Sequence, residues 1–347
     1  MLRPLTGFTL AEMPQHRFVV LDDWTRFYPR VPALNRLRAR GEVVLHHVPA
    51  ADEDEVIERL RGATVAILNR ERTPMRARVI KHAEDLELIA QTGRISPNVD
   101  AEAASQQGVA LVAGGGAPGG HAAVAELGLA LLLALVRQIP ANDRRMRAGD
   151  WDAPPTSMLH GRTLGIVGLG NIGGWMARLA HALGMTVIAW GPTLTPERAA
   201  QSQVDYVAFD DLFPRADVLF VSVRLSDLTR GLVGAQQLAA MRPTSYLINI
   251  ARGPIVDETA LVAALQQGRL AGAGLDVYDV EPLPRDHPLL KLDNVILTPH
   301  IGWGTDGNFL KMVENTVDAV IRYLDGDLSG VVNVAVLERR AAGCTRA

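Results

Sequence analysis

The sequence is poor in cysteine, in surplus charge and in long hydrophobic runs, and each scarcity excludes a class of protein. The single cysteine, Cys344, rules out a disulfide framework and a cysteine-based metal site. The formal net charge of −3 gives no electrostatic reason to expect nucleic acid or an anionic membrane as a partner. The longest apolar run, Leu127–Val136, is too short to cross a bilayer, and Met1–Arg17 lacks the apolar stretch of a secretory signal. We therefore expect a cytoplasmic protein that acts on a small molecule and holds no metal.

Short β-type runs alternate with helical stretches along the chain, a pattern typical of parallel sheets. With 347 residues the chain is long enough for two domains, and the glycine-rich segment Gly114–Gly120 followed by a helix over His121–Val136 separates them. We predict two Rossmann-like, doubly wound α/β domains. Residues 1–120 and 305–347 form a flavodoxin-like substrate domain, and residues 121–304 form a dinucleotide-binding domain. The last predicted helix, Asn308–Leu324, returns to the first domain and makes it discontinuous.

The predicted strands are short and mostly apolar. They lie at Phe18–Leu21, Val43–His47, Val65–Leu68, Leu86–Ala90 and Val109–Val112 in the first domain, and at Leu164–Val167, Thr186–Ala189, Val218–Val221, Ser245–Ile250, Gly272–Leu275 and Val295–Leu297 in the second.

A Gly-x-Gly-x-x-Gly motif lies between the strand Leu164–Val167 and a helix predicted over Trp175–Leu183. In this setting Gly168 permits a tight turn, Gly170 lets the backbone approach a pyrophosphate, and Gly173 lets the helix pack closely on the strand. The N-terminus of the helix supplies free N–H groups to the phosphates. The motif in this context predicts a dinucleotide site.

Three side chains suited to hydride transfer follow predicted strands of the same domain. Such a transfer needs a cation that polarises the carbonyl oxygen and an acid that delivers a proton. Arg252 can hold a carboxylate in bidentate fashion, and His300 can exchange a proton near neutral pH. Glu281 would favour the imidazolium if it approaches His300. Each residue alone is typical of an ordinary loop, but with Asp276 they fall on one edge of one sheet and predict an active site.

Four motifs resemble the D-isomer-specific 2-hydroxyacid dehydrogenase family, which includes glyoxylate and hydroxypyruvate reductases, D-lactate dehydrogenases and D-3-phosphoglycerate dehydrogenases. They lie at Gly168–Gly173, Asn249–Asp257, Gly274–Pro282 and Thr298–Gly302, and the likeness extends from about residue 17 to residue 334. The resemblance implies an enzyme that uses NAD or NADP to interconvert a small 2-keto acid and a D-2-hydroxy acid.

The resemblance also implies a role for individual residues. Arg252 is implied as the substrate anchor, Glu281 and His300 as a proton-relay pair, and Asp276 as a partner of the nicotinamide carboxamide. A homodimer built on the helix over residues 120–136 is implied as well. The cofactor-binding residues predicted in this way are Gly168, Gly170, Asn171, Ile172, Gly173, Trp190, Gly191, Thr193, Ala251 and Asp276, and the substrate-binding residues are Gly93, Arg94, Ile95, Arg252 and Trp303.

The chain departs from the family where an acidic residue usually accepts the hydroxyls of the adenosine ribose. Gly191 stands there, so the usual selection for NAD over NADP is missing. Thr193 and Thr195 could hydrogen-bond a 2′-phosphate, and Arg198 is a more distant cation. A plain turn at Gly191, with NAD bound through its other contacts, is the alternative. We favour NAD here and leave NADP open.

A second departure concerns the substrate side. Gly93 alone keeps the glycine-rich pattern of the family's carboxylate-binding loop, here Gln91–Pro97. Arg94 is either a turn residue that faces solvent or a second cation for a doubly acidic substrate, and Trp303 either walls the pocket or packs in the core. Formate and phosphite dehydrogenases resemble the same fold, but Glu281 stands where formate enzymes carry glutamine. The alternative from another class is a dinucleotide-sensing binding protein that resembles the family's corepressors.

Overall fold

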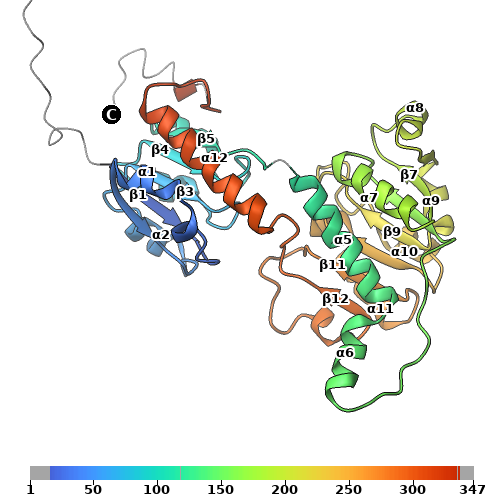
Figure 1. The fold of residues 1–347 in the computed structure, drawn as a ribbon. Coiled ribbons are helices and arrows are strands. Elements are labelled where there is room, and N and C mark those ends of the chain that lie inside the picture. The colour runs from blue at the N-terminus through green and yellow to red at the C-terminus, as the bar shows by residue number, and fades with distance from the viewer. Residues whose placement is uncertain (1–15, 118, 334, 337–347) are drawn as a thin grey trace, which may run out of the picture. The chain divides into compact units, whose positions relative to one another are not determined.

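The computed structural model describes residues 16–117, 119–333 and 335–336, so Cys344 and the segment before residue 16 lie outside the described residues. The chain forms two compact units, one of Met1–Pro118 with Asp306–Ala347 and the other of Gly119–Thr305. Each unit contains one sheet, and the paired strands of both sheets run parallel (Figure 1). The predicted α/β class, with two doubly wound parallel sheets and a discontinuous first unit, is confirmed.

The first unit is built on a five-stranded sheet in the order β2-β1-β3-β4-β5. The direction of winding changes between β1 and β3, and open α/β sheets bind ligands outside the carboxyl ends of the strands at such a point. Apart from the edge strand β2, the strands are largely buried apolar runs, as parallel strands covered by helices require. They span His16–Leu21 (β1), Gly41–Leu45 (β2), Val65–Leu68 (β3), Leu88–Gln91 (β4) and Ala110–Ala113 (β5).

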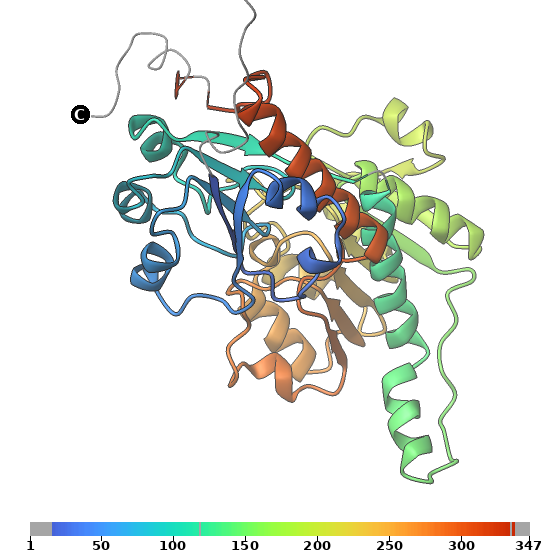
Figure 2. The ribbon, with the colours of Figure 1, turned by 60° about the vertical axis from the view of Figure 1, so that its left-hand side comes forward.

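Helices cover this first sheet on both faces (Figure 2). Three of them pack in a row and place Val56, Val79 and Ala104 in a core with Val19 and Ile89 of the strands. The other two contact each other, and the longer one also contacts β4 and β5. The row consists of α2 (Glu53–Arg59), α3 (Ala77–His82) and α4 (Ala101–Gln106), and the other pair of α1 (Leu34–Arg38) and α12 (Asp306–Leu324); a short 3₁₀ helix, η1 (Tyr28–Arg30), precedes α1.

The final helix, α12, buries a stripe of residues that recur every three or four positions, among them Phe309, Val313, Val317 and Val320. The ring of Phe27 meets Phe309 edge-on, with ring centroids 4.7 Å apart. This stripe explains why the helix, which follows the last strand of the second sheet in sequence, belongs to the first unit.

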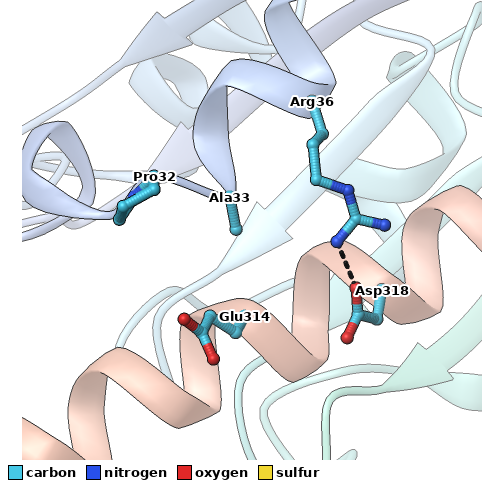
Figure 3. A pocket seen from close by; sticks show the side chains of 5 residues that line it. All are labelled: Pro32, Ala33, Arg36, Glu314 and Asp318. Carbon is cyan, nitrogen blue, oxygen red and sulfur yellow. Dashed lines mark hydrogen bonds and ion pairs between the residues drawn. The ribbon is translucent and has the colours of Figure 1, made fainter.

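A shallow pocket lies between α1 and α12 and is lined by Pro32, Ala33, Arg36, Glu314 and Asp318 (Figure 3). Arg36 donates a hydrogen bond to Asp318 across it. The two side chains are 50% and 38% exposed, so water screens their attraction. The contact joins two helices within the first unit, and Glu314 is the other ionisable side chain in the lining of the pocket.

The second unit is built on a seven-stranded sheet in the order β12-β11-β10-β9-β6-β7-β8. Here the winding direction changes between β6 and β9, which directs attention to the loops after these two strands. The strands span Thr163–Val167 (β6), Thr186–Trp190 (β7), Asp205–Tyr206 (β8), Val218–Val221 (β9), Tyr246–Asn249 (β10), Gly272–Leu275 (β11) and Val295–Leu297 (β12).

Two helices cover one face of the second sheet, where Leu132 and Met176 pack with Ile166 and Phe220. Three helices cover the other face through a separate core. Helix α6 and the chain that follows it stand away from the rest of the unit (Figures 1 and 2), until the amide of Ser157 donates to the Val136 carbonyl oxygen at 3.2 Å. The helices are α5 (Gly120–Val136) and α7 (Asn171–Ala182) on the first face, α9 (Phe209–Arg215), α10 (Ala235–Ala240) and α11 (Glu258–Gln266) on the second, and α6 (Ile139–Arg147), α8 (Pro196–Ala200) and the 3₁₀ helices η2 (Gly253–Ile255) and η3 (Pro288–Lys291) elsewhere.

The structure corrects the predicted bounds of some elements. Helix α7 begins at Asn171 and not at Trp175. The sequence pattern missed the first turn because its glycines have low helix propensity. The strand β8 was not predicted, since it consists of two exposed residues at a sheet edge. Four predicted strands agree with the structure residue for residue: Val65–Leu68, Val218–Val221, Gly272–Leu275 and Val295–Leu297.

Candidate active site

The loop from β6 to α7 has the backbone geometry that a dinucleotide needs. Gly168 has a φ of +99°, and a Cβ atom there would lie 2.6 Å from the backbone of Val223. A Cβ at Gly173 would lie 2.5 Å from the carbonyl oxygen of Gly168, so the helix approaches the strand more closely than any other residue permits. At Gly170, in contrast, a Cβ would meet no atom within 4 Å. The open side of the turn therefore lies at Gly170.

The first turn of α7 lies at this open side. The backbone amides of Asn171, Ile172 and Gly173 stand at the start of the helix, where no carbonyl four residues earlier belongs to the helix. Such amides and the positive end of the helix suit a pyrophosphate. The Ser222 hydroxyl stabilises this turn by donating a hydrogen bond to the Gly168 carbonyl oxygen at 2.8 Å. Ser222 was not predicted, although its place directly after β9 at the winding change is a usable signal.

The strand β7 ends beside the same turn, where the Trp190 carbonyl oxygen accepts a 2.7 Å hydrogen bond from the amide of Gly168. Gly191 is buried, and Thr193 is exposed in the loop that follows. The Arg198 side chain donates from Nη1 to the Thr193 carbonyl oxygen at 2.7 Å. The side chain of Arg198 therefore returns from helix α8 onto the loop that carries Thr193.

His300 and Glu281 form a direct pair at the carboxyl edge of the second sheet. His300 Nδ1 lies 2.7 Å from Glu281 Oε2, and Glu281 Oε1 accepts a hydrogen bond from the amide of Tyr278 at 3.0 Å. An ionised carboxylate only accepts hydrogen bonds, so Nδ1 carries the proton and Nε2 is the nitrogen left for exchange. The side chains are 27% and 35% exposed, which leaves the pair reachable by a ligand.

The charges around Glu281 keep it ionised. Burial by itself would raise the pKa of Glu281, but the hydrogen bond and charge of His300, the Tyr278 amide and the charge of Arg252 together lower the pKa below its usual value. The carboxylate can therefore fix the orientation of the imidazole through the hydrogen bond to Nδ1.

Asp276 holds the loop that carries His300. Its Oδ1 accepts hydrogen bonds from the Thr298 hydroxyl at 2.6 Å and the Ile301 amide at 2.9 Å, and its Oδ2 accepts from the Gly302 amide at 2.9 Å. The residue is 1% exposed, and burial raises the pKa of Asp276 although these hydrogen bonds and His300 oppose the shift. His300 has a φ of +54°, a conformation that this network supports.

The loop after β10 carries Arg252 and is fixed by Asn249. The Asn249 side chain donates to the Arg252 carbonyl oxygen at 3.1 Å and accepts from the Ala251 amide at 3.1 Å. Arg252 Nη1 donates to the Ala251 carbonyl oxygen at 2.7 Å. On the neighbouring loop, the Trp303 indole donates to the His300 carbonyl oxygen at 3.1 Å and so braces the histidine. The structure thus gathers Arg252, Glu281 and His300 at one edge.

The remaining predicted residues, Gly93, Arg94 and Ile95, follow β4 in the first unit. Gly93 has a φ of +86°, and a Cβ there would lie 2.3 Å from Nη1 of Arg70. Arg94 is exposed, and its carbonyl oxygen accepts from the Gln91 side chain at 2.8 Å, whereas Ile95 packs against the core. Arg70 was not predicted. The signal that was available is an arginine two residues beyond the buried strand β3.

The fold and this arrangement define an α/β protein with a dinucleotide-type sheet and a hydrogen-bonded histidine and glutamate at its carboxyl edge. Residues 129–302 match the model of the D-isomer specific 2-hydroxyacid dehydrogenase NAD binding domain. A glyoxylate reductase of Korarchaeum cryptofilum is 35% identical over 298 residues, which cover 83% of this chain and 88% of the relative. A phosphoglycerate oxidoreductase structure from Vibrio cholerae O395 superimposes with a TM-score of 0.84 at 33% identity, covering 90% of this chain and all of that one. The chain belongs to the D-isomer specific 2-hydroxyacid dehydrogenase family.

Several relatives are longer than this chain. A D-3-phosphoglycerate dehydrogenase of Archaeoglobus fulgidus is 42% identical over 243 residues, which cover 69% of this chain but 46% of the relative. The chain spans about half the length of such curated relatives. In the part of the chain that the structure describes, no single helix has both the length and the apolar composition to span a membrane. Helices α5 and α6 reach that length and composition only together, as a pair bent by 58°.

Proposed function

We propose that this chain reduces a small 2-keto acid to the D-2-hydroxy acid with a nicotinamide dinucleotide, or catalyses the reverse reaction. The observation that carries the proposal is the 2.7 Å pair between His300 Nδ1 and Glu281 Oε2 at the carboxyl edge of the dinucleotide-type sheet. A reduced nicotinamide, when bound, supplies the hydride that goes to the carbonyl carbon.

The side chains of the second unit supply the rest of the chemistry. Arg252 holds the carboxylate and polarises the adjacent carbonyl. His300 gives the proton on Nε2 to the carbonyl oxygen as the carbon receives the hydride, and regains a proton from solvent afterwards. Glu281 touches the imidazole and acts as the positioning group of the pair, and Asp276 holds the loop on which His300 stands.

The residues of the β6–α7 turn fit a dinucleotide. The space beside Gly170 and the first-turn amides of Asn171, Ile172 and Gly173 would hold the pyrophosphate. Trp190 ends β7, and Gly191 and Thr193 follow it. These three residues would lie on the adenosine side, with Ala251 and Asp276 on the nicotinamide side. In the first unit, we assign the Gly93 turn and the guanidinium of Arg70 to the substrate carboxylate.

We also propose a homodimer that uses α5 and the arm formed by α6 and the chain up to residue 158. Helix α5 is apolar almost all around, and the arm exposes Ile139, Met146, Trp151 and Met158, with 82% of Trp151 exposed. Large apolar side chains gathered on one projection are typical of an interface. Light scattering should report a dimer for the wild type and a monomer for the double variant Trp151→Ser, Met158→Ser; a wild-type monomer at micromolar concentration would reject this assignment.

Oxidation of NADH and NADPH in the presence of candidate acids tests the reaction. Glyoxylate, hydroxypyruvate, pyruvate, 3-phosphohydroxypyruvate and bulkier branched or aromatic 2-keto acids form the panel, because glyoxylate reductases and phosphoglycerate dehydrogenases occur among the relatives. Turnover with one or more of them is the expected result. A protein that binds a dinucleotide tightly and changes its assembly, but turns over no acid of the panel, would instead be a dinucleotide sensor.

A further inference from the structure

The loop after β7 lacks the acid that would recognise the ribose of NADH. A carboxylate at this place accepts the two ribose hydroxyls and repels a 2′-phosphate. Gly191 occupies it, and a Cβ there would make only ordinary contacts, 3.5 Å from Leu194 Cβ and 3.6 Å from Gly168 Cα. Space therefore does not exclude an aspartate at this position, and the glycine removes both the acceptor and the repulsion.

The same loop carries a positioned cation. Thr195 caps α8, and its hydroxyl accepts a 3.3 Å hydrogen bond from the backbone amide of Arg198. The Arg198 guanidinium then folds back and donates from Nη1 to the Thr193 carbonyl oxygen at 2.7 Å. A guanidinium has five N–H donors in a planar fork, so four remain for a ligand. The side chain is exposed, with its charge held over the loop by a neutral partner.

We propose that this chain prefers NADPH to NADH, and that Arg198 together with the Thr193 hydroxyl binds the 2′-phosphate. The inference rests on the proposed dinucleotide function and adds the identity of the cofactor. Arg–phosphate contacts are charge-assisted and often bidentate, which gives them both strength and geometric selectivity. NADH gains no comparable affinity at this loop, because its ribose 2′-hydroxyl would face Arg198 and Thr193 in place of a carboxylate.

One anion stands nearby and opposes the phosphate. Glu197 precedes Arg198 in α8, and hydrogen bonds from its own amide and from the Thr195 hydroxyl lower the pKa of its carboxyl. It is therefore tied to the cap of α8, whereas Arg198 is tied to the loop. Glu197→Gln should raise the affinity for a 2′-phosphate by a smaller factor than Arg198→Ala reduces it.

Calorimetric titration with nucleotide fragments measures the contact between Arg198 and the 2′-phosphate separately from turnover. The ligands are 2′,5′-ADP and 5′-AMP, which differ by the 2′-phosphate, followed by NADPH and NADH. We expect the wild type to bind 2′,5′-ADP about 10- to 100-fold more tightly than 5′-AMP, the range of one hydrogen bond between charged groups. Arg198→Ala should abolish that difference and leave the affinity for 5′-AMP unchanged.

Two further variants sharpen the test. Arg215→Ala removes an exposed arginine at the end of α9, which leads to the amino end of β9 and so to the opposite edge of the sheet, and should change neither affinity. Gly191→Asp should reverse the preference toward NADH. Circular dichroism and thermal melting confirm that each variant is folded.

The outcomes separate this inference from the proposed function. Tighter binding of NADH than of NADPH by the wild type, or an equal loss of both fragments in Arg198→Ala, overturns the cofactor assignment and leaves the reductase proposal in place. Failure of the folded wild type to bind any of the four nucleotides overturns both.

Discussion

The carboxyl edges of the two sheets are built by different means. In the second unit, carboxylates bind the residues of the edge: Glu281 pairs with the His300 imidazole, and Asp276 accepts hydrogen bonds from the backbone amides that follow His300. In the first unit, the corresponding edge is a backbone turn at Gly93 against the guanidinium of Arg70. A paired acid and base can move a proton, whereas a turn beside a cation can only hold an anion. Under the proposed function, the second edge carries out the chemistry and the first edge recognises the substrate.

The largest expected effect comes from removing the proton donor. His300→Asn should lower kcat by about 100- to 10,000-fold, the usual contribution of general acid–base catalysis. The affinity for the reduced dinucleotide, measured by fluorescence titration, should stay within about twofold, because the substitution leaves the β6–α7 turn intact. Unchanged turnover in the folded variant would show that His300 takes no part in the mechanism. The proposed difference in role between the two edges would then no longer hold.

A smaller effect should distinguish the two arginines. Arg70→Ala removes a recognition cation and should raise KM by about 10- to 100-fold with little change in kcat. Arg252→Lys keeps the charge but loses the bidentate geometry beside the reacting carbonyl, so kcat and kcat/KM should both fall. Lys81→Ala, at the exposed end of α3, is the control in the first unit and should change neither constant. If Arg70→Ala lowers kcat with an unchanged KM, the first edge takes part in the chemistry.

The network around Asp276 predicts a loss of stability. Thr298→Val replaces the hydroxyl that donates to Asp276 Oδ1 at 2.6 Å and leaves a carboxylate that is 1% exposed with one donor fewer. We expect the free energy of unfolding, measured with urea, to fall by about 1–3 kcal/mol. Thr186→Val, at an exposed end of β7, is the control and should change it by no more than about 0.5 kcal/mol. Equal losses in both variants would mean that the carboxylate is satisfied without Thr298.

Much of this comparison was accessible from the sequence, because strand periodicity and the positions directly after strands are local signals. Gly168, Arg252 and His300 could be placed at one edge since parallel strands end together. The contacts that give these residues their properties could not be placed in the same way. The return of Arg198 onto the Thr193 carbonyl depends on how α8 is capped, and the approach of Arg70 to Gly93 depends on two neighbouring strands that are 20 residues apart in sequence.

The smallest predicted effect concerns the pH dependence of stability. The folded state lowers the pKa of Glu281 below its ordinary value of 4.5, so the ionised carboxylate favours folding. This contribution is fully present above the ordinary value and disappears as the pH falls through the lower, folded value. Because the carboxylate is 35% exposed, we expect no more than about 1 kcal/mol.

Urea unfolding of the wild type and of Glu281→Gln, from about pH 6 to about pH 3, measures this contribution. The wild type should be the more stable protein at the upper end, and the difference in the free energy of unfolding should shrink toward the lower end, because the amide in the variant does not titrate. A difference that stays constant over this range would show that the His300–Glu281 pair orients the imidazole without stabilising the fold. A difference that grows on acidification would contradict the sign of the shift, and with it the account of the second edge as a pair held together by charge.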